Sequence, residues 1–182
     1  MDPTATLTPP VGPRDHAQGS ADAPVTLVEY GDYECPFCGE AYGIVKQLQA
    51  DEGSRLRFVF RNFPLTQSHP FAEKAAEAAE AAGAQGKFWE MHDMLYEHQD
   101  ALEPQDLIAY ATELGLDVER FTRDLDAGTY AERVREDFMS GVRSGVNGTP
   151  TFFINGRRLD AGFDLETLET AVNAAAGSRR GA

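Results

Sequence analysis

The strongest constraint on the fold is an apolar strand that runs into a pair of cysteines and then a helix. Residues 25–30 are β-branched, apolar or aromatic at nearly every position, which predicts a central strand. Apolar residues at helical spacing from Pro36 to Leu48 predict a helix that Gly53 ends. Residues 56–61 predict the next strand. The segment is therefore predicted to be a βαβ unit with a parallel strand pair.

A long middle segment, from residue 70 to about residue 144, has a different character. It is rich in alanine and acidic residues and contains no predicted strand. Apolar spacing and helix breakers predict five helices, over residues 72–84, 88–96, 104–114, 117–125 (with Asp117 as N-cap) and 130–142. Between residues 71 and 137 there are 17 Asp and Glu against 6 Lys and Arg. We interpret this acidity as a solvated helical surface.

Strand character returns near the end of the chain. Residues 151–154 are followed by Asn155-Gly156, the strongest short signal for a hairpin turn, and residues 157–159 are predicted to be the return strand. A last helix is predicted to start at or beside Asp164.

These elements predict an α/β protein with an inserted helical block. The core is assigned to residues 21–65 and 146–176, and the all-helical insertion to residues 66–145. Residues 1–20 hold four prolines and few apolar residues, so we expect a flexible arm. Residues 177–182 are expected to be a flexible tail.

The charge balance excludes several classes of partner. With 30 acidic and 16 basic residues, the net charge of −14 should repel nucleic acid and anionic membranes. No apolar run approaches the roughly 20 residues that span a bilayer. Residues 1–12 lack a basic start and an apolar stretch, which predicts a cytoplasmic protein. The alternative is an extracytoplasmic location, if the sequence is a mature form.

The two cysteines, Cys35 and Cys38, indicate chemistry. At the start of a helix, unpaired N–H groups and the helix dipole favour an anion, so the Cys35 pKa should fall from ~8.5 into the ~3.5–7.5 range. Cys38 lies one turn further along and should be less exposed. Cys35 is therefore predicted to attack or leave a mixed disulfide, and Cys38 to close or open the internal disulfide.

Two other uses of the cysteine pair, a zinc site and a structural disulfide, have less support in the sequence. Zinc needs four ligands, and the cysteine pair supplies two, which leaves His69, His92 and His98 as candidates; His92 and His98 are six positions apart and do not stack on one helix face. A purely structural disulfide would close too short a loop to constrain the unfolded chain. We therefore expect no metal and no cofactor.

Two further features favour redox chemistry. Glu29 lies six residues before Cys35 on the apolar strand, where a buried carboxyl should have a raised pKa and could accept the proton of Cys38. The alternative is an edge position with the carboxylate in water. Thr149-Pro150 precedes a strand, and a cis bond there would expose the Thr149 backbone beside the cysteines.

Three stretches resemble the DsbA-like branch of thioredoxin-fold disulfide oxidoreductases. They are VTLVEYGDYECPFC at residues 25–38, the helical block, and GTPTFFING at residues 148–156. The similarity covers about residues 22–175. Phe63-Pro64-Leu65 with His69-Pro70 is also similar to this branch, particularly to stand-alone bacterial members and versions fused to sodium/proton antiporters.

The resemblance implies a thioredoxin-like fold (βαβ … ββα) with a helical insertion. It also implies a nucleophilic Cys35, a resolving Cys38, a cis Pro150 after Thr149, and Glu29 as the buried acid of the family. The expected partners are protein thiols or disulfides and a thioredoxin- or glutathione-type redox partner, and we expect a monomer. Oxidases of the family often carry histidine where this chain has Phe37, which predicts a less forceful oxidant. The direction of electron flow stays open.

Two other functions compete with a protein-disulfide oxidoreductase. Glutathione-using isomerases or transferases can share a thioredoxin core with a helical insertion, but they usually activate glutathione with a single serine or similar group. A binding or chaperone module would work unchanged without Cys35 and Cys38. His69 has two interpretations, a group that tunes Cys35 or a residue that caps or packs at the entry to the helical block.

Overall fold

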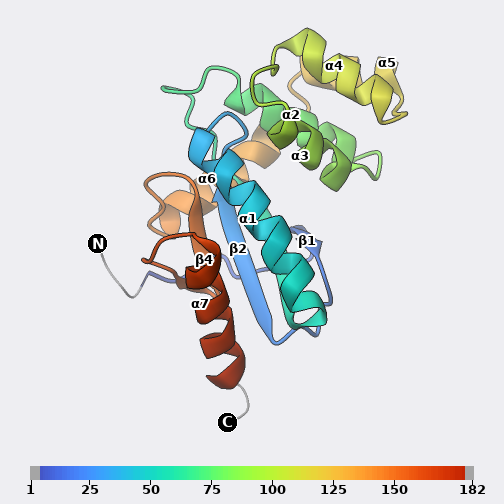
Figure 1. Ribbon diagram of the computed structural model, residues 1–182. Helices are drawn as coiled ribbons and strands as arrows, with labels where there is room; N and C mark the ends of the chain where they lie inside the picture. The colour runs from blue at the N-terminus through green and yellow to red at the C-terminus, as the bar shows by residue number, and fades with distance from the viewer. Residues whose placement is uncertain (1–4, 179–182) are drawn as a thin grey trace. The chain divides into compact units, whose positions relative to one another are not determined.

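A computed structural model describes residues 5–178 of the chain (Figure 1). By its internal contacts the described chain divides into two compact units. The first comprises residues 5–31, 40–61 and 140–178, and the second residues 32–39 and 62–139. The second unit therefore contains the turn with both cysteines as well as the helices of the insertion, whereas the sequence assigned that turn to the core.

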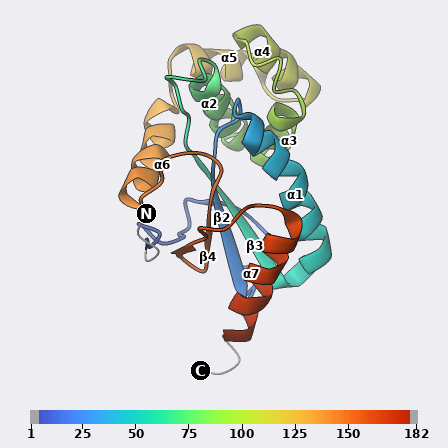
Figure 2. The same cartoon turned by 60° about the vertical axis from the view of Figure 1, so that its left-hand side comes forward.

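The first unit is built on a five-stranded sheet with the order β1-β3-β2-β4-β5. Figure 2 labels three of these strands, β3, β2 and β4. Its strands are β1 (His16–Gln18), β2 (Val25–Gly31), β3 (Leu56–Asn62), β4 (Thr151–Ile154) and β5 (Arg157–Arg158). Its helices are α1 (Pro36–Glu52), which begins in the cysteine turn, and α7 (Leu165–Ser178), with a short 3-10 helix at Gly53–Arg55. β2 is central and almost wholly buried, as its apolar sequence predicted, and α7 packs against β2 and β4.

The hairpin and the last helix confirm their sequence signals. Asn155 and Gly156 have φ angles of 47° and 82°, which is the backbone that a tight turn between two antiparallel strands requires. Asp164 accepts hydrogen bonds from the Thr167 backbone N–H and hydroxyl, so it caps α7. The helix extends to Ser178, and the rest of the predicted tail lies outside the described residues.

The prediction of a flexible arm over residues 1–20 is wrong for the part that is described. His16–Gln18 form β1, which pairs antiparallel with β3. Leu7 is buried, and its N–H donates to the carbonyl of Gly156. The arm is ordered because it meets a buried partner, Arg61, whose guanidinium binds Asp15 in two places and also the carbonyl of Pro9. Proline-rich composition carried no information about this partner.

The second unit is a helical block whose five helices match the prediction to within about two residues at each end, the usual margin for helix boundaries. They are α2 (Ala72–Gly83), α3 (Phe88–Glu97), α4 (Pro104–Glu113), α5 (Val118–Asp126) and α6 (Ala131–Arg143), the last of which runs on into the first unit. α2 packs against α3, α4 and α5. Its alanines are buried on almost every side, and such small side chains let three neighbours approach the helix closely. Asp117 caps α5 through the Arg120 N–H, as predicted.

Candidate active site

The cysteine pair lies in a turn whose geometry begins with Asp32, the first residue after β2. The Asp32 side chain is fully buried. One of its carboxylate oxygens, Oδ1, accepts the Glu34 N–H at 2.8 Å, and its backbone carbonyl accepts the Cys35 N–H at 3.2 Å. Asp32 therefore fixes the backbone that leads into the helix.

Cys35 occupies the position directly before α1, and its carbonyl accepts the Gly39 N–H at 3.1 Å. That bond is the first of the helix, so Cys35 is the N-terminal capping residue, where unpaired N–H groups favour a negative charge. Both cysteines are buried, Cys35 with 4% and Cys38 with 0% of its surface exposed. The order of exposure is the one expected of an attacking and a resolving thiol. Phe37 between them is 62% exposed.

Gln99, in the loop after α3, holds the turn from the helical block. Its side-chain amide donates to the carbonyl of Tyr33 at 2.8 Å and to the carbonyl of Cys35 at 2.9 Å. A Cβ added at Gly39 would overlap that amide. Glycine at position 39 therefore leaves the space that Gln99 needs.

We predict that Gly39→Ala destabilises the protein by about 1–2 kcal/mol, because the displaced amide loses two hydrogen bonds to backbone carbonyls. Gly43→Ala is the matched control, since it lies in the same helix and a Cβ there meets nothing within 4 Å. The control should stabilise by roughly 0.5–1 kcal/mol through helix propensity. Urea unfolding of both variants measures the two changes, and equal effects would contradict a specific role for the Gln99 contact.

Aromatic packing supports the other side of the turn. The hydroxyl of Tyr33 and Nδ1 of His92 are 3.0 Å apart, and both residues are buried. The His92 ring also contacts the rings of Phe88, Trp89 and Tyr96. Buried Phe88 and half-buried Trp89 thus contact a histidine that packs against the turn.

His69 binds the same aspartate that shapes the turn. Its Nδ1 lies 2.8 Å from Oδ2 of Asp32, which also accepts the Leu65 N–H. A buried carboxylate offers only acceptors, so Nδ1 carries the proton. Burial works to lower the pKa of His69, but the hydrogen bond to Asp32 and the charges of Asp32, Cys35 and Glu34 outweigh it, and the pKa is raised.

This raised pKa predicts a pH-dependent contribution to stability. The native protein holds the His69 proton more tightly than the unfolded chain does. The stabilisation is therefore fully present below the unfolded pKa of about 6.5 and is lost as the pH rises through the native pKa. We expect His69→Gln to lower the free energy of unfolding more at about pH 5.5 than at about pH 9. A difference that is equal at both pH values would contradict the assignment.

The remaining predicted site residues lie in the first unit. Glu29 is buried, with 2% of its surface exposed, and pairs with Phe152 across β2 and β4, so the alternative of a solvated edge carboxylate is wrong. The Thr149–Pro150 peptide bond is cis and leads directly into β4. The hydroxyl of Thr151 donates to the carbonyl of Gly148 across this bend.

The histidines considered as zinc ligands have other partners. His69 binds Asp32, His92 contacts Tyr33, and Nδ1 of His98 lies 2.9 Å from the carbonyl of Met94. Among residues 5–178, no three or more His, Cys, Asp and Glu side chains gather in a way that could hold a metal ion.

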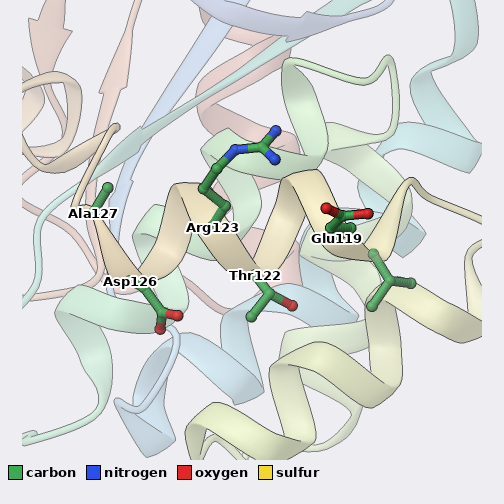
Figure 3. Close-up of a pocket in the computed structure, with 6 residues that line it drawn as sticks. Glu119, Thr122, Arg123, Asp126 and Ala127 are labelled. Atoms are coloured by element: carbon green, nitrogen blue, oxygen red, sulfur yellow. The ribbon is translucent and has the colours of Figure 1, made fainter.

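A hollow on the surface of the helical block lies apart from this chemistry. Its lining comes from α5 and the residue after it, and includes Glu119, Thr122, Arg123 and Asp126 (Figure 3). A face formed by one exposed helix encloses no reacting group. We therefore place the candidate site at the cysteine turn.

Sequence reasoning missed Asp32 and Gln99. Asp32 had a readable signal, because a carboxyl at the end of a central strand, three residues before a cysteine at a helix start, lies where such groups affect thiol chemistry. Gln99 had none, since an amide in a loop 64 residues from Cys35 becomes relevant only through folding.

A family model described as thioredoxin matches residues 12–174, which is most of the chain. The chain belongs to the thioredoxin family. A thioredoxin-like oxidoreductase from Silicibacter pomeroyi is 29% identical with a TM-score of 0.80, covering 94% of this chain and 95% of that one. BdbD from Bacillus subtilis is 26% identical with a TM-score of 0.81, covering 90% and 93%.

The fold is the DsbA-like form that the resemblance implied. The structure of alpha-DsbA1 from Wolbachia pipientis has a TM-score of 0.78, covering 92% of this chain and 94% of that one. At 18% identity this comparison shows the fold alone. It confirms a thioredoxin-like α/β core with helical elements.

The curated relatives carry a different name. A Na(+)/H(+) antiporter NhaA 1 from Salinispora arenicola is 52% identical over 175 residues, which are 95% of this chain and 27% of that protein. The chain thus spans about a quarter of the length of the curated relatives it matches. Within residues 5–178, none of the helices is long and apolar enough to cross a membrane.

Proposed function

We propose that this protein is a thiol–disulfide oxidoreductase that exchanges disulfides with protein substrates through Cys35 and Cys38. The observation that carries the proposal is the position of Cys35 directly before α1, with Cys38 buried one turn into the helix. The likeness to an oxidoreductase at 29% identity supports the same reaction class. A glutathione-using isomerase or transferase needs only a single activating group, so that function would not explain the second cysteine.

The reaction follows from the order of the two thiols. In the reducing direction the Cys35 thiolate attacks a substrate disulfide, the substrate S–S bond breaks, and the leaving sulfur takes up a proton. A mixed disulfide joins Cys35 to the substrate. Cys38 then loses its proton and attacks the sulfur of Cys35, which releases the second substrate thiol and leaves a Cys35–Cys38 disulfide. A partner dithiol must reduce that disulfide before the next cycle, and reversal of every step gives substrate oxidation.

Three further roles belong to this proposal. Glu29 as a carboxylate accepts the proton of Cys38, and its burial supports the role because a carboxylate kept away from water is a stronger base than one in water. The Thr149 backbone beside Pro150 binds the extended backbone of a substrate. The position of Thr149 supports this role, because it lies outside the strands, just before β4. Exposed Phe37 supplies an apolar contact for an unfolded client, since an exposed aromatic between two reactive thiols is costly unless it is covered during use.

Redox titration combined with a turnover assay tests the proposal. After equilibration with glutathione buffers of known potential, alkylation and mass measurement should show Cys35 and Cys38 gained or lost as one two-electron couple. The protein should also accelerate insulin reduction by dithiothreitol. A potential near that of the cytosolic glutathione pool would favour reduction, and a much higher one would favour oxidation. Two thiols that titrate independently, with no acceleration of insulin reduction, would overturn the proposal.

A further inference from the structure

Asp32 connects His69 to Cys35 through a short chain of hydrogen bonds. The His69 ring donates to the Asp32 carboxylate at 2.8 Å, and the backbone carbonyl of Asp32 accepts the Cys35 N–H at 3.2 Å. All three residues belong to one compact unit. The histidine is therefore tied to the turn that carries the reactive sulfur, although it lies 34 positions away along the chain.

The environment of His69 favours a positive charge. The ionisable groups that act on it are Asp32, Glu34 and Cys35, and all three are acids of the turn. Its side chain is 19% exposed, whereas that of Asp32 is fully buried. Nδ1 is committed to Asp32, and among residues 5–178 Nε2 makes no hydrogen bond to protein, so protonation at Nε2 breaks no contact.

We infer that His69, held by buried Asp32, is the cation that stabilises the Cys35 thiolate. The residue between the two cysteines, Phe37, carries no charge that could do this. The inference rests on the proposed function for its biological meaning, since it names the residue that sets how strongly the site oxidises. His69 acts on the reacting sulfur through its charge and does not exchange a bond with it, so it is a positioning residue.

The physical argument is that an interaction between two charges is mutual. An anionic Cys35 raises the pKa of His69. The same coupling energy must then lower the pKa of Cys35 whenever His69 is charged. The negative charge of Asp32 works against this lowering of the Cys35 pKa, but the Asp32 carboxylate oxygens already accept hydrogen bonds from His69, Leu65 and Glu34. In the His69–Asp32 pair, the imidazolium is the charge nearer to solvent.

The first test measures the acidity of Cys35 directly. The Cys38→Ser background isolates the Cys35 thiolate, which is followed by its absorbance in the ultraviolet against pH. We expect His69→Gln to raise the Cys35 pKa by about one unit, a tenfold loss of thiolate below the pKa, at the low end of the range for one nearby opposite charge. Glutamine can still donate to Asp32, so the change removes the charge and keeps the contact.

The reduction potential supplies an independent readout in the intact protein. Weaker stabilisation of the thiolate in His69→Gln disfavours the reduced form, so the couple should become less oxidising by up to tenfold in its equilibrium constant, or ~30 mV. His98→Gln is the matched control, because His98 belongs to the same unit but bonds to a helix carbonyl. The control should leave the Cys35 pKa and the potential unchanged.

A reciprocal measurement keeps the inference testable if His69→Gln folds poorly. In the chain with His69 intact, the His69 pKa read by NMR should fall when Cys35 is replaced by alanine. An unchanged Cys35 pKa in a folded His69→Gln protein, or an unchanged His69 pKa in Cys35→Ala, would overturn the inference. Failure of the insulin assay with the coupling intact would instead remove the proposed function and leave the His69–Cys35 interaction standing.

Discussion

Replacement of Cys35 by serine is expected to abolish disulfide exchange. The hydroxyl has nearly the same size as the thiol, so the capping position before α1 is kept, but it cannot form a mixed disulfide. The protein's acceleration of insulin reduction over the dithiothreitol background should fall by at least about 10³-fold, since loss of the nucleophile in an enzyme with a covalent step costs that much or more. The unfolding midpoint in urea should change little, which separates lost chemistry from lost structure.

Cys38→Ser is the informative companion, because it removes only the second step. Cys35 can still attack a substrate disulfide, but nothing resolves the product, so a mixed disulfide with substrate should accumulate. Non-reducing electrophoresis with a reducible client protein detects the adduct, and reductant should release it. An adduct formed by Cys35→Ser in place of Cys38→Ser would reverse the assigned roles.

The second large effect is expected on stability, from Arg61→Leu in the first unit. The guanidinium is buried and makes two bonds to Asp15, at 2.7 and 3.0 Å. It also donates to the Tyr30 hydroxyl at 2.9 Å and to the carbonyls of Pro9 and Pro10. Leucine would remove the guanidinium donor from the Asp15 carboxylate, from two carbonyls and from the Tyr30 hydroxyl. Removal of one partner from a buried pair costs about 3–5 kcal/mol.

Urea unfolding of Arg61→Leu measures this loss, and Arg143→Leu, at an exposed position in the last turn of α6, serves as the control. The control should stay within about 0.5–1 kcal/mol of the unmodified protein, as surface substitutions usually do. Limited proteolysis should then cut Arg61→Leu within residues 9–15, because the segment loses its buried anchor. A variant as stable as the control would show that the arm is held by β1 and Leu7 alone.

Much of the fold could be predicted because its signals are local. Hydrophobic spacing located β2, α1 and β3, and the five helices of the insertion were placed to within about two residues at each end, the usual margin for helix boundaries. Asn155-Gly156 marked its hairpin, and Asp117 and the Asp164 position marked helix starts. Each of these signals acts within a few residues of the element it specifies. β1 escaped prediction because its three residues gain strand geometry only by pairing with β3.

The candidate site likewise has a part that local sequence signals predict and a part that only the fold brings together. Cys35 and Cys38 were identified from the sequence, because the start of a helix and the spacing of two thiols are local properties. The partners that tune and hold them come from elsewhere in the chain, as His69 and Gln99 do. The sequence could suggest that His69 is either packed or functional, but only the distance between its Nδ1 and the Asp32 carboxylate identifies Asp32 as its partner.

The sequence by itself indicated the cysteine pair of the candidate site, the helix that begins at it and the family to which the chain belongs. The tertiary structure decided that Asp32 is buried, that a histidine far along the chain donates to it, and that a proline-rich arm is fastened by Arg61. The physical reason is that helix and turn formation depend on neighbouring residues, whereas burial and charge pairing depend on which distant side chains folding brings together.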